Sequence, residues 1–357
     1  MLEAREAVRK LKEYHPPLGG RVGLRLDFNE NTVGCSPRVL ERVRQLQFDQ
    51  LARYPERESV ERQIAAHLGV DCAGLLLTNG VDEAIHLVCE TYLEVGDEVL
   101  IVVPTFSMYE IYAAATGARV ITIPAGPEFR YPTDDVLARI SPRTRLIAIA
   151  NPNNPTGAVV ARGDLLRVLR AAPDAAVLVD EAYFDFYGES LLEEVANSPN
   201  LFVARTFSKA YGLAGLRIGV LVGNAAQMAM VRRVGSPYNV NAVALACLPE
   251  AFADQDYVRQ YVAEVRQGRE QLEQELRSLR LRFWPSQANF VLVLIGERHG
   301  DFVRAMRERG ILVRDRSRDP GCDGCVRISV GLGGQTEQLI VALREALCEI
   351  APMWVRR

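Results

Sequence analysis

The regular alternation of short apolar runs with helical segments between residues 74 and 223 most constrains how this chain folds. The apolar runs consist mainly of Val, Ile, Leu and Ala, which is typical of strands buried on both faces. Helical segments lie between most of these strands, and this order favours crossover connections and a mostly parallel sheet. The predicted strands are 74–80, 98–104, 119–124, 144–152, 175–183, 201–209 and 217–223, and the main helices between them are 81–93, 107–117 and 163–172.

A different pattern begins after residue 240, where 241–280 is helical sequence dense in Glu, Gln and Arg. A long helix at 254–280 leads into a second group of elements, which are strands 288–294, 311–314 and 325–330 and helices 300–309 and 335–349. The chain has 357 residues, and single cores tend to stop growing near ~250–300 residues. We therefore expect an α/β protein with two domains.

The first domain, residues 51–253, is predicted to be large, with a mostly parallel sheet sandwiched by helices. The second, smaller α/β domain is predicted to combine residues 1–50 with residues 254–357. Within 1–50 we expect an amphipathic arm over residues 1–14, a short strand running into a polar turn at 26–31, and a helix that opens at Ser36-Pro37.

Composition excludes several classes of partner. With 42 basic and 45 acidic residues the formal net charge is -3, so the charge favours neither nucleic acid nor an anionic membrane as a partner. The sequence contains no apolar run of the ~20 residues that span a bilayer, and its charged N-terminus does not resemble a signal peptide. We expect a cytoplasmic protein with small-molecule substrates.

The seven cysteines are scattered through apolar or helical sequence, which is typical of reduced, packed thiols. Cys322 and Cys325 alone have the spacing of a metal or redox pair. A zinc ribbon needs a second pair and a thioredoxin-like site needs a strand-to-helix setting, and the flanking sequence predicts neither. We interpret the pair as a turn with two incidental thiols and predict no metal site.

Lysine is rare in this chain, and one lysine lies deep inside the sequence. Only Lys10, Lys12 and Lys209 occur among the 42 basic residues; the others are arginines. A lysine amine loses its proton when it is desolvated and then attacks carbonyl groups, which arginine does not do. A surface lysine left by chance is the alternative reading, and the flanking residues argue against it.

The residues around Lys209 have the composition of a phosphate site. Thr206 and Ser208 supply hydroxyl groups, nearby glycines allow an open turn, and Arg217 supplies a planar cation. A phosphate beside a reactive amine indicates pyridoxal phosphate as the cofactor.

Further candidate residues follow other predicted strands, where ligands bind in open parallel sheets. Asp180 suits a pyridinium nitrogen, although an Asp after a strand is also typical of a turn or helix cap. Tyr183 and Asn154 offer hydrogen bonds to a phenolic oxygen, although the sequence around Asn154 is equally that of a proline-locked turn. Phe106 suits stacking on a flat ring or packing in the core.

Anionic groups have two further candidate sites. The free N–H groups of Gly80, Val81 and Asp82, where a strand turns into a helix, favour a phosphate. Arg327 interrupts an apolar strand and, with Arg314, suits a substrate carboxylate or phosphate, although an edge-strand arginine with its charge in water has the same pattern.

These residues occur in motifs that resemble the class I/II aminotransferases, which are pyridoxal-phosphate enzymes of fold type I, and most closely the histidinol-phosphate branch. The resemblance spans nearly the whole chain. The motifs are LDFNEN (26–31), RYPE (53–56), TNGVDEAI (78–85), PTFSMY (104–109), NPNNPTG (151–157), DEAY (180–183), TFSKAYGLAGLRIG (206–219), PYNVN (237–241), ILVRDRS (311–317) and VRISVG (326–331).

The resemblance implies an aspartate-aminotransferase-like fold and a role for each candidate residue. Lys209 would hold the cofactor and move protons, with Asp180 and Tyr183 as its catalytic partners. Tyr54 would reach the phosphate across a homodimer interface, so that two subunits share each active site. Tyr14, Asn29, Arg314 and Arg327 would bind the substrate. Many relatives carry Tyr where this chain has Phe106, and stacking survives that change.

The expected reaction is the pyridoxal-phosphate-dependent transamination of histidinol phosphate with 2-oxoglutarate, which yields imidazole acetol phosphate and glutamate in histidine biosynthesis. The alternatives are an aromatic amino acid aminotransferase and a decarboxylase of the phosphothreonine type with the same fold. A non-catalytic regulator that keeps the cofactor fold is a third alternative, from a different functional class.

Overall fold

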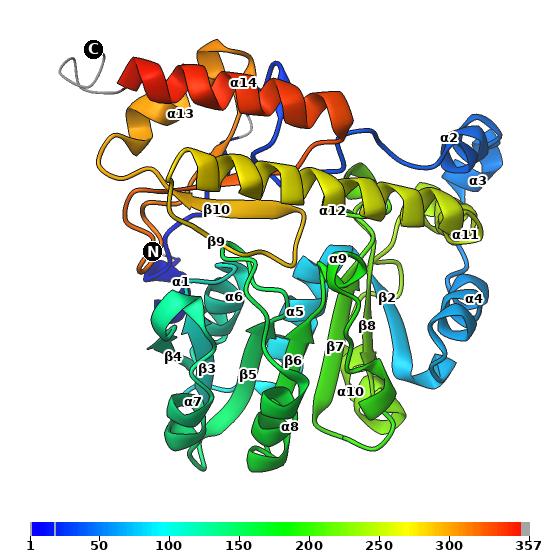
Figure 1. The fold of residues 1–357 in the computed structure, drawn as a ribbon. Coiled ribbons are helices and arrows are strands. Elements are labelled where there is room, and N and C mark those ends of the chain that lie inside the picture. The colour runs from blue at the N-terminus through cyan, green and yellow to red at the C-terminus, as the bar shows by residue number, and fades with distance from the viewer. Residues whose placement is uncertain (1, 18, 351–357) are drawn as a thin grey trace.

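The computed structural model describes residues 2–17 and 19–350. In Figure 1 a large sheet flanked by helices forms the lower part of the molecule, and helices α12 (Gln255–Ser278) and α14 (Gly333–Ile350) cross above it. Two small sheets lie with these upper helices. The expected aspartate-aminotransferase-like α/β fold is confirmed.

The large sheet has seven strands, and most neighbouring pairs in it are parallel. The exception is β8, which runs antiparallel to both of its neighbours. In spatial order the strands are β2 (Leu75–Thr78), β8 (Gly219–Gly223), β7 (Leu201–Thr206), β6 (Ala176–Asp180), β5 (Thr144–Ala150), β3 (Glu98–Val103) and β4 (Arg119–Pro124).

Alternate residues of one strand enter two different cores, as expected for strands buried on both faces. In β6, Val177 and Val179 pack in one core and Leu178 in the other. The smaller core holds residues of α5 (Gly80–Tyr92), α6 (Met108–Thr116) and α10 (Ala225–Val234). The larger holds residues of α4 (Glu58–Leu68), α7 (Thr133–Arg139), α8 (Arg162–Ala171), α9 (Phe184–Tyr187) and α11 (Ala242–Ala253).

The larger core continues without interruption into the C-terminal part of the chain, where it includes residues of α12, α13 (His299–Glu308) and α14. These helices accompany a four-stranded antiparallel sheet whose order is β12 (Arg314–Asp315), β13 (Cys325–Ser329), β10 (Phe290–Leu294) and β9 (Phe283–Trp284). Strands β1 (Leu24–Arg25) and β11 (Ile311–Leu312) form a separate parallel pair.

The N-terminal residues contact both parts of the molecule. Strand β1 joins the C-terminal part through β11, whereas α1 (Glu6–Arg9) lies against α6 of the large sheet, where Arg5 donates a hydrogen bond of 3.0 Å to the carbonyl of Ala115. The remaining helices are α2 (Pro37–Arg44), α3 (Phe48–Ala52) and the 3₁₀ turns η1 (Cys72–Gly74), η2 (Pro127–Phe129), η3 (Leu192–Glu194) and η4 (Ala214–Leu216).

Most predicted elements occur within a few residues of their expected bounds, and α2 begins at Pro37 with Ser36 as its cap. Two N-terminal predictions are wrong. The polar turn predicted within 26–31 is present at Asn29, whose φ is +55°, but the strand before it lies earlier than expected, at Leu24–Arg25. The predicted arm contains only four helical residues, with none of them buried. The division into 51–253 and 1–50 with 254–357 stays a proposal, and residues 1, 18 and 351–357 lie outside the described ranges.

Candidate active site

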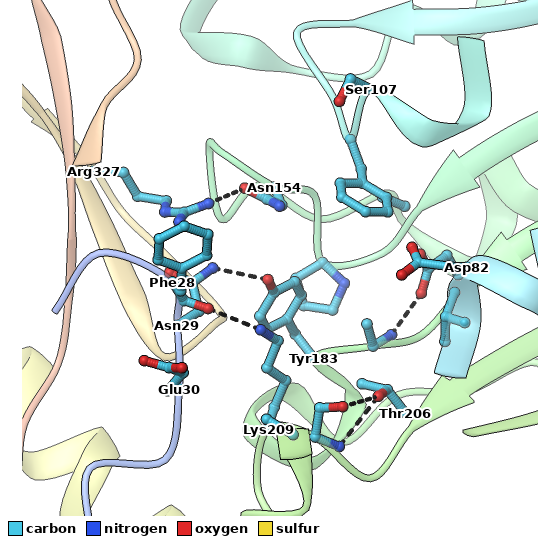
Figure 2. A pocket seen from close by; sticks show the side chains of 18 of the residues that line it. Phe28, Asn29, Glu30, Asp82, Ser107, Asn154, Tyr183, Thr206, Lys209 and Arg327 are labelled. Carbon is cyan, nitrogen blue, oxygen red and sulfur yellow. Dashed lines mark hydrogen bonds between the residues drawn. The ribbon is translucent and has the colours of Figure 1, made fainter. Parts of the chain in front are cut away.

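A cavity of about 410 Å³ lies where the carboxyl ends of the large-sheet strands face the segment Phe28–Glu30 and the small sheet (Figure 2). Fourteen of the predicted site residues line it, although they come from distant parts of the chain. They are Tyr14, Asn29, Val81, Asp82, Phe106, Asn154, Asp180, Tyr183, Thr206, Ser208, Lys209, Arg217, Arg314 and Arg327.

Lys209, three residues after β7, lines this cavity, and its side chain extends toward Tyr183 (Figure 2). Its Nζ donates a hydrogen bond of 3.0 Å to the carbonyl of Phe28. Part of its surface is open to the cavity, but protein surrounds the amine densely. Burial, assisted by the positive charge of Arg327, lowers the pKa of Lys209 to about 8. Near neutral pH the neutral, nucleophilic fraction of this amine is therefore far larger than that of an ordinary lysine.

Asp180, the last residue of β6, is a buried carboxylate that accepts two hydrogen bonds. Tyr109 donates to its Oδ2 over 2.5 Å, and the backbone N–H of Ala182 donates to its Oδ1 over 2.9 Å. Burial raises the pKa of Asp180 to about 6, although both hydrogen bonds act in the opposite direction. A cationic partner in the cavity would restore the ionised form.

Tyr109 is a site residue that the sequence patterns do not reveal. It lies in the first turn of α6, and a tyrosine there is as typical of a helix core as of a binding site. The nearest sequence signal is its spacing of three residues from Phe106, which places both side chains on one side of the turn. In the structure their rings meet edge to face with centroids 5.8 Å apart.

Asn29 connects the four-stranded sheet, through Ser329 of β13, to Tyr183. Its Nδ2 donates to the hydroxyl of Tyr183 over 2.8 Å, and its Oδ1 accepts from the hydroxyl of Ser329 over 3.0 Å. Its backbone N–H donates to the same Ser329 oxygen over 2.9 Å, and its carbonyl accepts from Asn289. These contacts hold Asn29 in the left-handed region, where non-glycine residues are uncommon.

The residues predicted to bind the phosphate lie together near the start of α5. Thr206 donates a hydrogen bond of 2.9 Å to Ser208, and Arg217 forms an ion pair of 3.0 Å with Asp82. Gly80 does not line the cavity itself but lies directly behind Arg217. A Cβ atom on Gly80 would lie 2.9 Å from Nη2 of Arg217, and the φ of Gly80 is +76°. A residue without a side chain therefore lets the guanidinium approach the helix N-terminus.

The opposite end of the cavity is cationic. Arg327 donates to Oδ1 of Asn154 over 2.5 Å and to the carbonyl of Asp27 over 2.7 Å, and among the described residues its buried Nε has no partner. Burial lowers the pKa of Arg327 to about 10. Arg314 and Arg316 line the same end. Arg316, which the sequence patterns did not single out, adds a third guanidinium.

Two aromatic residues predicted at the site lie at or beyond its margin. Tyr14 lines the cavity and keeps 43% of its surface exposed. Tyr54 does not line the cavity of its own chain; it is 79% exposed and stacks on Tyr238 with ring centroids 4.2 Å apart. This exposure leaves Tyr54 available to a second subunit.

Cys322 and Cys325 lie away from the cavity. Both thiols are buried, and the N–H of Cys325 donates to the carbonyl of Cys322 over 2.8 Å, as in a turn. Across residues 2–17 and 19–350 there is no cluster of three or more His, Cys, Asp or Glu side chains suited to a metal ion. None of the described helices is long and apolar enough to cross a bilayer.

Comparison with known proteins identifies the family. The model of the aminotransferase class I and II family matches residues 21–345. The chain belongs to the class I and II aminotransferases. It is 35% identical to a histidinol-phosphate aminotransferase of Moorella thermoacetica over 97% of this chain and 93% of that protein. It is also 35% identical to a protein of the same name from a Geobacillus species, over 91% of this chain and 90% of the relative.

Solved structures agree with this membership of the aminotransferases. Histidinol-phosphate aminotransferase of Sinorhizobium meliloti, solved in complex with pyridoxal-5'-phosphate, matches with a TM-score of 0.89 and 25% identity, over 98% of this chain and 99% of that one. Aspartate aminotransferase of Thermus thermophilus matches with a TM-score of 0.82 at 23% identity over 98% of this chain and all of the other, which supports the fold alone. The resemblance inferred from the motifs is confirmed.

The residues of the cavity suit pyridoxal phosphate. Its aldehyde requires a neutral amine, which the lowered pKa of Lys209 provides. Its ring nitrogen requires an acid in a dry setting, which Asp180 provides, and its phosphate requires hydroxyls and a guanidinium near a helix N-terminus. The close approach of Arg217 to Gly80 forms such a cradle.

Proposed function

We propose that this chain is a pyridoxal-phosphate-dependent aminotransferase that moves the amino group of histidinol phosphate to 2-oxoglutarate. The products would be imidazole acetol phosphate and glutamate. Relatives 33–36% identical over most of the chain carry the name histidinol-phosphate aminotransferase, which supports this substrate. The observation that carries the proposal is the enclosed amine of Lys209, which lies in the same cavity as the buried carboxylate of Asp180 and four guanidiniums.

The cofactor would be held at its ring nitrogen, its ring face, its phenolic oxygen and its phosphate, and when bound it would supply the electron sink for the reaction. Asp180 would face the ring nitrogen, while Phe106 stacks on the ring. Asn154 and Tyr183 would donate to the phenolic oxygen. The phosphate would contact the amides of Gly80, Val81 and Asp82 and the side chains of Thr206, Ser208 and Arg217.

Lys209 has two tasks in this proposal. Its neutral Nζ would be the nucleophile that holds the cofactor, and once free the same Nζ would accept the proton from the substrate Cα. Both tasks need an unprotonated amine, and burial beside Arg327 favours that state. The hydrogen bond to the carbonyl of Phe28 orients the amine across the cavity.

The cationic end of the cavity suits both substrates. Guanidiniums bind phosphate and carboxylate groups through paired hydrogen bonds, and Arg314, Arg316 and Arg327 line this end together. Arg314 also lies over the ring of Phe28 at 5.1 Å. We infer that Arg327 and Arg314 anchor the anionic group of either substrate, with Tyr14 and Asn29 beside it.

The active site would be completed by a second copy of this chain. Apolar side chains on and beside α3 are exposed, with Phe48 at 86%, Leu51 at 58% and Tyr54 at 79%. Tyr238, which stacks on Tyr54, is 57% exposed. Such a patch favours burial against another subunit. The homodimer would bring Tyr54 to the partner's phosphate site, and we place the enzyme in the cytoplasm.

Replacement of Lys209 by alanine tests the proposal. We expect Lys209→Ala to lose both the visible absorbance of bound cofactor and transamination, whereas Lys12→Ala, at an exposed position, keeps both. Persistence of both signals in Lys209→Ala would falsify the assignment.

The substrate is tested separately, by a screen of amino donors against the cofactor-loaded enzyme. Faster turnover of phenylalanine than of histidinol phosphate would favour the aromatic aminotransferase. Release of carbon dioxide from threonine phosphate without a keto product would favour the decarboxylase. Binding of cofactor without reaction with any donor would favour the non-catalytic regulator.

A further inference from the structure

The hydrogen bond between Tyr109 and Asp180 is the feature of the site that the proposed roles leave unexplained. The two residues belong to different elements, α6 and β6, and lie 71 positions apart in the sequence. Their oxygens are 2.5 Å apart, and Tyr109 is only 1% exposed. A bond this short between a neutral donor and a carboxylate is typical of charge-assisted hydrogen bonds.

Tyr109 remains a hydrogen-bond donor throughout the neutral and mildly alkaline pH range. Burial, together with the negative charge of Asp180, raises its pKa well above the ordinary value of 10. The phenol therefore keeps its proton and directs it at Asp180. The contact of its ring with Phe106 fixes the side chain further.

The other charged groups near Asp180 are already paired. Asp82, on α5, forms an ion pair with Arg217, and the neighbouring Glu181 forms one with Arg205 at 2.8 Å. Both carboxylates disfavour ionisation of Asp180. The hydroxyl of Tyr183 accepts a hydrogen bond from Asn29. Tyr109 and the N–H of Ala182 are thus the groups that favour the ionised carboxylate.

We propose that Tyr109 is a positioning residue that acts through Asp180, and that its hydrogen bond keeps the proton shared with the cofactor on the ring nitrogen rather than on the carboxylate. This inference rests on the proposed function. Each hydrogen bond that a carboxylate accepts lowers its affinity for a proton, and a buried carboxylate without enough donors takes the proton instead.

The location of this proton matters for the reaction. A protonated ring withdraws electrons from the reacting carbon, whereas a neutral ring does so weakly. Loss of the phenolic hydroxyl should therefore slow the proton transfer to Lys209, which contributes to kcat. Binding of the amino substrate should change little, because Tyr109 lies on the cofactor side of the cavity, with Asp180, rather than among the arginines.

The test uses the cofactor-loaded enzyme with Tyr109→Phe, and Tyr112→Phe on the same helix is the matched control. Tyr112 stacks on His86 at 5.0 Å and does not line the cavity. In Tyr109→Phe we expect kcat to fall roughly 10- to 100-fold, the range that a hydrogen bond to a charged group contributes, while KM stays within about twofold. The control should match the wild type.

A second readout separates positioning from a structural role. With cofactor labelled with ¹⁵N in the ring, Tyr109→Phe should move the nitrogen resonance toward the unprotonated position. Incorporation of 3-fluorotyrosine at position 109 keeps the shape of the ring and strengthens the donor, so it should move the resonance in the opposite direction. This second variant also serves if Tyr109→Phe does not fold.

An unchanged ¹⁵N resonance in both variants, or in the fluorotyrosine variant alone if Tyr109→Phe does not fold, overturns the inference. A fall in kcat without a change in the resonance also overturns it, since the effect would then be structural. Failure of the wild-type chain to bind pyridoxal phosphate would refute the proposed function, and with it the role of Tyr109.

Discussion

Replacement of Asp180 by asparagine should stabilise the cofactor-free protein while it abolishes catalysis. The ionised carboxylate lies in a dry site that suits a cation, so without the cofactor its charge disfavours folding. Asparagine has nearly the same shape, can still contact Tyr109 and carries no charge. The substitution therefore removes the unfavourable burial of the negative charge at little steric cost.

The size of this effect follows from the pKa of Asp180, which burial raises from an ordinary 3.8 to about 6. A tenfold change in proton affinity corresponds to about 1.4 kcal/mol, so the ionised carboxylate costs the fold about 3 kcal/mol. The pKa of Asp180 is higher in the folded than in the unfolded protein. Below pH 3.8 the protonated side chain therefore imposes no cost on folding, and this stability is lost as the pH rises toward 6. The cost is complete at pH 7.5 and about 1 kcal/mol at pH 4.5.

Scanning calorimetry of the cofactor-free protein measures this difference. For 357 residues the unfolding entropy is about 0.75 kcal/mol per degree, so about 3 kcal/mol raises Tm by about 4 °C. We expect Asp180→Asn to exceed the wild type by about 4 °C at pH 7.5 and by much less at pH 4.5. Asp174→Asn, at an exposed turn, is the control and should follow the wild type at both pH values.

Addition of pyridoxal phosphate should reverse the order, because only the wild type has a carboxylate for the ring nitrogen. A Tm for Asp180→Asn that is equal to or below that of the wild type at both pH values, without cofactor, would refute the electrostatic reasoning. If the Tm advantage of Asp180→Asn were the same at pH 4.5 and pH 7.5, its cause would be packing rather than charge.

Three further predictions follow from the site. Arg327→Lys should raise KM for the anionic substrate about 100-fold, because lysine lacks the paired donors of the guanidinium and leaves the carbonyl of Asp27 without its partner. Steady-state kinetics measure this effect, and an unchanged KM would contradict the prediction. Incorporation of cofactor into the cofactor-free protein should accelerate as the pH rises through about 8, the lowered pKa of Lys209; a rise only near 10.5 in stopped-flow absorbance contradicts it. Gly157→Ala should destabilise the fold by at least about 1 kcal/mol, since its Cβ would lie 2.1 Å from the hydroxyl oxygen of Ser286 and its φ is +73°; an unchanged denaturant midpoint contradicts it.

Local sequence was sufficient for the large sheet and for the central amine. Strands such as 176–180 have apolar residues at consecutive positions, and only burial on both faces accommodates that pattern. Lys209 was identified from composition, because lysine is rare here and its neighbours carry hydroxyls. These features depend on periodicity and residue chemistry within a few positions, which the sequence states directly.

The segment 26–31 shows where such local reasoning ends. We expected a short strand that runs into a polar turn, and the turn forms at Asn29, where contacts with distant groups hold a left-handed conformation. Ser329 and Asn289, about 300 and 260 positions away, saturate its polar atoms. Local sequence therefore predicts the polar turn but misplaces the strand, whose partner β11 lies far away in the sequence.

By itself, the sequence of this protein determined the α/β class, the family and fourteen residues of one cavity. Only the tertiary structure decided that Tyr109 donates to Asp180 and that Arg316 joins the cationic end. The physical reason is that a side chain's chemistry is local, whereas its hydrogen-bond partner and its burial depend on which distant strands and helices the fold brings beside it.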